Sequence, residues 1–190
     1  MFALDARSER IVAFLLILLM AATRVHHFGI GNIAPDASTA VFFLAGLFLA
    51  GPFWFAVLAA EAVVLDAVAI GLVGVAAACM TLGYWMLFVG YLALWYAGRL
   101  GRASERLDVA TAGKLVVVAA VGVVAFFVLS NVGYYFGAGY DKSMGAAEYV
   151  SRVSGYLPMY LVSTLAYAAA GVALFAIAAR LLPHGRLAAR

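Results

Sequence analysis

Long apolar stretches, separated by short polar ones, make up most of the 190-residue chain. A helix needs about 20 mostly apolar residues to cross the hydrocarbon core of a membrane, so stretches of this kind predict membrane-spanning helices. Six are expected, over residues 8–25, 37–50, 52–70, 78–99, 110–135 and 156–182. The pattern therefore predicts an all-α integral membrane protein with one transmembrane domain over residues 1–190.

Two features interrupt this pattern. Gly51-Pro52 separates a short second helix from the third, and we interpret the pair as a tight hairpin with Pro52 in the first turn of the third helix. The alternative is a single kinked helix, which would leave five spans. Longer loops are expected at 26–36 and 136–155.

Composition excludes several classes of protein. The chain is 67% hydrophobic and 11% charged, with a mean hydropathy of +1.07, which is far from the average of soluble domains. Its net charge of +3 indicates no nucleic-acid partner, because the basic residues gather at helix ends. There is no glycine-rich phosphate-binding loop, so the chain is not expected to be an ATPase by itself.

The basic residues predict the orientation. With six spans, nine of the twelve fall on the side of both termini: Arg7, Arg10, Arg99, Arg102, Arg106, Lys114, Arg180, Arg186 and Arg190. The other side carries Arg24, Lys142 and Arg152. Cytoplasmic ends of membrane helices are enriched in Lys and Arg, so both termini are expected in the cytoplasm and the chain in a bacterial inner membrane.

The same orientation places most candidate chemistry on the outer side. These residues are His26, His27, Asp36, Asp66, Cys79, Tyr84, Asn131, Tyr134, Tyr135, Asp141 and Arg152. The lone cysteine lies in the stretch "GLVGVAAACMTLGYW", residues 71–85, and cannot form an internal disulfide. A lone membrane cysteine usually serves as a small hydrophobic residue, and that reading stays open for Cys79.

Two acidic residues lie within the third expected helix. A charge at membrane depth costs roughly 2.5–3.5 kcal/mol on insertion scales, so an idle role for either is not expected. Asp66, about one turn from the outer end, can hold His27 or Arg152 in position, or can form a simple salt bridge. Glu61 lies deeper, where a protonated carboxyl can make a hydrogen bond between helices.

Tyrosines are dense on the outer side. Tyr84 and Trp85 lie near the outer end of the fourth expected helix, and further tyrosines follow at 134, 135, 140, 149, 156 and 160. A tyrosine offers flat apolar area and a hydroxyl, which suits a large planar ligand fringed with amides. An interfacial belt of aromatic residues is the alternative reading.

Several of these patterns together resemble the BtuM family. They are the six-span layout, "NIAPDASTAVFFLAG" after the first helix, the cysteine after a Gly/Ala loop, and "FFVLSNVGYY" in the fifth helix. Members of that family resemble the substrate-binding S-components of energy-coupling-factor (ECF) vitamin transporters and are assigned to cobalamin uptake. The resemblance implies an S-component-like bundle that binds cobalamin as its transported ligand, with Cys79 on the cobalt.

The implied ligation is chemically reasonable. A thiolate is a soft ligand that suits corrin cobalt, and it would displace the vitamin's own base to give a base-off form. Donation from the thiolate would weaken the bond to an opposite cyanide, so removal of cyanide at Cys79 is a further expectation. The expected binding residues are Cys79, His27, Asp66, Tyr84, Trp85, Asn131, Tyr135 and Arg152.

One feature departs from the S-component pattern. S-components that share a coupling module often carry alanines four residues apart on the first helix, and "IVAFLLILLMAATR" has none. Such a pair occurs instead at Ala56 and Ala60, which puts an ECF energising module as partner in doubt. Two other classes stay open: a membrane thiol enzyme, either a Cys-His-Asp hydrolase or a redox protein, and a structural subunit.

Overall fold

The computed structural model describes residues 2, 4–24, 35–73, 81, 83–102 and 108–181, and every regular element within them is helical. The elements are α1 (Ala6–Thr23), α2 (Ser38–Phe48), α3 (Phe53–Val73), α4 (Tyr84–Arg102), α5 (Val109–Gly137), the 3₁₀ helix η3 (Tyr140–Lys142), α6 (Ala146–Ser154) and α7 (Leu157–Leu181). The expected all-α class is confirmed for this part of the chain. Each of the six apolar stretches overlaps one α-helix, and α6 is additional.

The sequence explains where several helices begin. The carboxylate of Asp5 accepts a hydrogen bond from the backbone N–H of Ser8 over 2.7 Å, and Asp108 caps α5 through Thr111 over 2.8 Å. The α3 helix begins directly after Pro52, whose fixed φ suits a helix start. The break before Pro52 makes α2 and α3 two helices, so the alternative of one kinked helix is wrong.

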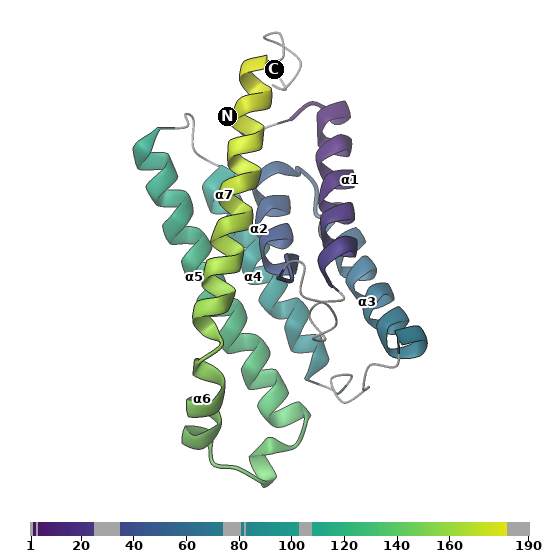
Figure 1. Ribbon diagram of the computed structural model, residues 1–190, viewed down its shortest axis with the longest axis vertical. Helices are drawn as coiled ribbons and strands as arrows, with labels where there is room; N and C mark the ends of the chain where they lie inside the picture. The colour runs from purple at the N-terminus through teal and green to yellow at the C-terminus, as the bar shows by residue number, and fades with distance from the viewer. Residues whose placement is uncertain are drawn as a thin grey trace.

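The short helix α2 lies at the centre of the bundle (Figure 1). All eleven of its residues are buried, and it contacts α1, α3, α4, α5 and α7. Its approach to α4 depends on glycines, since a Cβ atom at Gly46 or Gly98 would overlap the backbone of the facing helix. Small residues at such contacts let membrane helices pack closely.

Charged side chains form hydrogen bonds with the backbone at the end of α2. Eleven residues span only about 16 Å, against a hydrocarbon core of about 30 Å. The carbonyls of Leu49 and Ala50 accept hydrogen bonds of 2.6 Å from Arg102 and Arg99, and the N–H of Ala50 donates to Glu9 over 2.7 Å. Backbone N–H and C=O groups at the end of a helix have no partner within the helix, so inside a membrane protein they need partners of this kind. We call this end of the bundle the Glu9 end.

Three of the described helices are long and apolar enough to cross a membrane: α3, α5 and α7. The expectation of six spans is supported for these three only. The α2 helix is too short, α1 carries Arg7, Glu9 and Arg10 near its start, and α4 contains several Tyr and Trp residues and ends in two arginines. Polar residues of this kind lower the mean hydropathy of a helix below that of a typical span.

The region 136–155, expected as a loop, is partly helical. The α5 helix continues to Gly137, and η3 and α6 follow. Within α6 the side chain of Tyr149 is buried, whereas Arg152 and Glu148 form an exposed ion pair of 2.6 Å at i,i+4 spacing. An amphipathic helix of nine residues is stabilised by such pairs and by burial of one face, which a search for long apolar stretches does not detect.

The described basic residues separate between the two ends of the bundle (Figure 1). The start of α1, the end of α4, the start of α5 and the end of α7 share the Glu9 end. Arg7, Arg10, Arg99, Arg102, Lys114 and Arg180 belong to these segments. Arg24, Lys142 and Arg152 belong to segments at the opposite end, which we call the Asp66 end.

Candidate functional site

A buried arginine lies at the Asp66 end. Arg24 follows α1 and is 1% exposed, and Asp66 of α3 is 2% exposed. Nε and Nη2 of the guanidinium donate to the two carboxylate oxygens of Asp66, each over 2.7 Å. A bidentate pair sets the orientation of both groups as well as their distance, so the end of α1 is fixed to α3 at Asp66.

Two further helices join this ion pair. Nη1 of Arg24 donates to the hydroxyls of Ser38 in α2 and Tyr91 in α4, each over 2.9 Å. The hydroxyl of Tyr84, at the start of α4, donates to Oδ2 of Asp66 over 2.6 Å. Hydrogen bonds with charged groups are about twice as strong as neutral ones, so the ion pair connects four segments.

Stacking holds Tyr91 in this position. Its ring lies 4.1 Å from that of Phe42 and 5.2 Å from that of Phe126, measured between centroids, with interplanar angles of 11° and 20°. The guanidinium carbon of Arg24 is 5.8 Å from the Tyr91 centroid. The hydroxyl of Tyr91 is therefore directed at Arg24 by stacking of its ring with two aromatic neighbours.

Asp36 extends the polar cluster toward α7. Its Oδ1 accepts hydrogen bonds from the backbone N–H and the hydroxyl of Ser38, over 2.8 and 2.6 Å. The six residues form what we call the Arg24 network: Arg24, Asp36, Ser38, Asp66, Tyr84 and Tyr91. It contains one basic and two acidic side chains, so its formal charge is negative.

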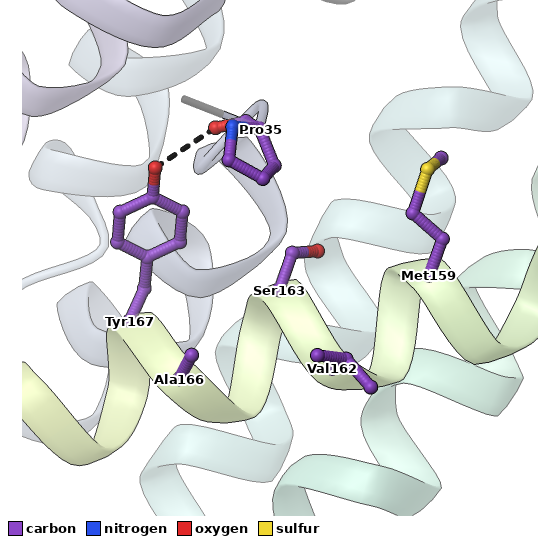
Figure 2. A pocket seen from close by; sticks show the side chains of 6 residues that line it. All are labelled: Pro35, Met159, Val162, Ser163, Ala166 and Tyr167. Carbon is purple, nitrogen blue, oxygen red and sulfur yellow. Dashed lines mark hydrogen bonds between the residues drawn. The ribbon is translucent and has the colours of Figure 1, made fainter. Parts of the chain in front are cut away.

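A groove lies beside this network, between α5 and α7. Its volume is about 400 Å³. It is lined by Pro35, Asp36, Phe127, Asn131, Tyr156, Met159, Tyr160 and Ser163, and we call it the Asp36 groove. Figure 2 shows an adjoining, more apolar cavity of about 430 Å³ along α7, which shares Pro35, Met159 and Ser163. There the hydroxyl of Tyr167 donates to the carbonyl of Pro35 over 2.9 Å and holds it against α7.

The amide of Asn131 has a fixed orientation in the wall of the groove. Its Nδ2 donates to the carbonyl of Phe127 over 2.8 Å, and its Oδ1 accepts from the hydroxyl of Tyr149 over 3.1 Å. Burial raises the pKa of Tyr149, and the neighbouring Tyr140 raises it further, so this hydroxyl keeps its proton and remains a donor.

The structure brings some of the expected site residues together. Asp66 and Tyr84 belong to the Arg24 network, and Asn131 lies in the wall of the Asp36 groove. Cys79 and His27 lie outside the described residues.

Other expected residues stand apart from the network. Trp85 is 61% exposed and meets the ring of Tyr84 edge-on, with centroids 5.9 Å apart. Tyr135 donates to the carbonyl of Met144 over 2.9 Å. The side chain of Arg152 is 63% exposed and pairs with Glu148, so it is not the partner of Asp66.

The central residue of the network was missed from the sequence. From the sequence Arg24 counts only as one of three basic residues on the outer side, because an arginine at the end of an apolar helix can usually extend its side chain to the membrane surface. The signal was available: Asp66 needed a cationic partner, and Arg24 is the basic residue at that end that directly follows an apolar helix.

Glu61 has no hydrogen-bond partner among the described residues, although both of its carboxylate oxygens are buried. The expected hydrogen bond between helices is therefore not present in this part of the structure. Buried polar atoms usually have partners, which makes Glu61 an exception in α3.

A comparison of the sequence with models of protein families finds no match, and a search of curated proteins finds no similar sequence. The candidate site consequently rests on the geometry of the Arg24 network and the Asp36 groove.

Proposed function

We propose that this chain binds cobalamin and takes it up across a bacterial inner membrane, as a six-span protein similar to the S-components of vitamin transporters. The observation that supports the proposal most is the position of the Arg24 network. Arg24 directly precedes the segment 25–34, Asp36 follows it, and Tyr84 follows the segment 74–82. Residues of the Arg24 network thus lie before and after the segment that contains His27, and another lies after the segment that contains Cys79.

The Asp36 groove adds a second support. It presents an amide, hydroxyls and aromatic rings beside that frame, which is the mixture expected for a large planar ligand with amide side arms. Cys79 is the proposed axial ligand of cobalt in a base-off corrinoid. Coordination takes the thiolate, so the thiol must release its proton on binding.

Loss of cyanide follows from the same ligation. The Cys79 thiolate pushes electron density onto the cobalt and weakens the opposite cobalt–carbon bond. Cyanide then leaves with the bonding electron pair, so the oxidation state of cobalt does not change. On this proposal the chain is mainly a transporter, and the exchange of the upper ligand accompanies binding.

The experiment is expression with cyanocobalamin, purification in detergent and an absorbance spectrum. Wild-type protein should purify red, with a thiolate–cobalt band and the spectrum of base-off cobalamin. Cys79→Ala should keep the fold and lose that band. Cys79→Ser should behave like Cys79→Ala, because a hydroxyl is a harder and far less acidic donor. Ser143→Ala, an exposed change, serves as the control. A base-off spectrum retained by Cys79→Ala would refute the role of the thiol.

The proposed orientation has its own test. Both termini are placed in the cytoplasm because nine of the twelve basic residues share their side. Single cysteines introduced at Ser104 and Ser143 in a Cys79→Ala background should differ in whole cells. An impermeant maleimide should label position 143 only, and labelling at position 104 would reverse the topology.

A further inference from the structure

We propose that Arg99 and Arg102, at the Glu9 end, form a binding site for the phosphate group of an anionic phospholipid. This pair lies at the opposite end of the bundle from the Arg24 network, so the inference holds whether or not the chain binds cobalamin. It gives a second role to two arginines that also bind the backbone at the end of α2.

The two guanidiniums are held close together. Nη1 of Arg102 donates to the carbonyl of Leu49 over 2.6 Å, and Nη1 of Arg99 donates to the same oxygen over 3.3 Å. Nη2 of Arg99 donates to the carbonyl of Ala50 over 2.6 Å, and its guanidinium carbon is 5.5 Å from the ring centroid of Trp95. Contacts with the backbone and the indole thus fix both charges before a ligand binds.

Most N–H donors of this pair have no partner in the described part of the chain. A guanidinium has five N–H groups, and the hydrogen bonds to Leu49 and Ala50 use three of the ten. Both arginines are partly exposed, so the other N–H groups are open to a ligand. Two N–H groups of one guanidinium match two phosphate oxygens, which suits this pair to a phosphate.

The charge of the pair is only partly compensated. Neither guanidinium forms an ion pair with a carboxylate of the described residues. Glu9 lies nearby, but its Oε1 accepts from the backbone N–H of Ala50 and from Nε1 of Trp54, over 2.7 and 3.0 Å. The two arginines and Glu9 together keep a net positive formal charge. Two cations held close together repel each other, and an anion bound between them offsets that repulsion.

Aromatic residues indicate that this pair lies at the depth of the lipid headgroups. Trp and Tyr gather where membrane helices cross the headgroup region. Trp54 lies in the first turn of α3, a helix long and apolar enough to span a membrane. Trp95 lies beside Arg99, and Tyr96 is 61% exposed. Lipid phosphates lie at the same depth, and in an anionic lipid no cation of the headgroup balances the phosphate charge.

The test measures the melting temperature of the full chain in a neutral detergent, followed by tryptophan fluorescence. The additives are phosphatidylglycerol, phosphatidylcholine with the same acyl chains, inorganic phosphate, and NaCl at the ionic strength of the phosphate. The variants Arg99→Gln and Arg102→Gln keep a side-chain N–H donor and remove the charge. Lys114→Gln removes an exposed basic charge at the same end and is the matched control.

Phosphatidylglycerol should raise the melting temperature of wild type by several degrees more than phosphatidylcholine, because a ligand that binds the folded state stabilises it. Each arginine variant should lose at least half of this difference, and Lys114→Gln should keep it. The difference is taken between two lipids for one variant, so a lower starting stability from lost contacts with α2 does not affect it. Inorganic phosphate should act no more than NaCl, because it lacks the acyl chains that keep a lipid at the site.

Three results would overturn the proposal. Equal melting temperatures of wild type in the two lipids would leave the arginines to the α2 contacts or to an acidic protein partner, and this comparison needs no variant. An equal loss in Lys114→Gln would show a diffuse effect of surface charge. If inorganic phosphate stabilises wild type as much as phosphatidylglycerol, the ligand is a soluble phosphate and not a lipid.

Discussion

The ion pair of Arg24 and Asp66 gives a sharp test of what holds the Asp66 end together. The variants are Arg24→Met, Asp66→Leu and the double variant, which replace charged side chains by apolar ones of similar size. Each single variant leaves one buried group without its bidentate partner. The double variant removes both charges and leaves an apolar contact in their place.

The magnitudes follow from the burial. Removal of one partner of a buried ion pair costs about 3–5 kcal/mol of the free energy of unfolding, because the other charge stays buried without compensation. Asp66→Leu should cost the most, since a guanidinium cannot lose its proton and Arg24 would keep only Ser38 and Tyr91. Arg24→Met should cost less, since Asp66 keeps Tyr84 and can take up a proton.

The double variant should be more stable than either single variant. Replacing a whole buried ion pair by packed apolar groups is often neutral or stabilising, although the remaining hydroxyls lose charged partners here. We expect the double variant to lose at least about 3 kcal/mol less than the sum of the single losses.

The free energy of unfolding is measured by titration with sodium dodecyl sulfate in mixed micelles, followed by tryptophan fluorescence. Arg7→Met, which removes an exposed basic residue at the Glu9 end, is the control and should change little. Strict additivity of the two single losses would refute the reasoning. So would a stability of Asp66→Leu equal to that of wild type, because a buried arginine would then have tolerated the loss of its carboxylate.

Two further predictions concern the helices. Gly98→Ala should lower the melting temperature by several degrees, because its Cβ would overlap the backbone at Phe43, whereas Gly113→Ala, with open space around it, should not. Hydrogen bonds from the backbone N–H of Ser8 and Thr111 lower the pKa of Asp5 and Asp108. Because the pKa is lowered in the folded state, the ionised carboxylate stabilises the helix start fully above the ordinary carboxyl pKa of about 4. This stabilisation is lost as the pH falls through the pKa of the folded state. Asp108→Ala should therefore speed hydrogen exchange at the start of α5 at pH 7 and have no effect at pH 2, and an equal effect at both pH values would contradict the assignment.

The helices of this bundle could be predicted because their signal is local. Each long apolar stretch becomes a helix, and Gly51-Pro52 marks the break between α2 and α3. The depth of each helix in a membrane has no such local signal. The shortness of α2 depends on partners for Leu49 and Ala50 that come from α4 and α1, far away in the sequence.

Asp36, Asp66 and Tyr84 of the Arg24 network could be predicted from the sequence, whereas Arg24, Ser38 and Tyr91 could not. A charge such as Asp66 inside an apolar helix is conspicuous, since its cost demands a partner. The identity of the partner depends on how α1 and α3 lie side by side, and Arg24 is 42 residues away. Tyr91 was hidden for a similar reason: it looks like any aromatic residue of an apolar helix until Phe42 and Phe126 stack on it.

The geometry of the Arg24 network also bears on the rival hypothesis of a Cys-His-Asp hydrolase. In such a triad the carboxylate orients a histidine and stabilises its positive charge when it takes a proton. Both oxygens of Asp66 already accept from a guanidinium, and Oδ2 accepts from Tyr84 as well. A histidine would have to compete with a permanent cation in bidentate geometry, which it cannot do without breaking the four-segment connection. Asp66 therefore suits a rigid frame for binding better than a relay for protons, and this favours a ligand-binding role at this end of the bundle over acid–base catalysis.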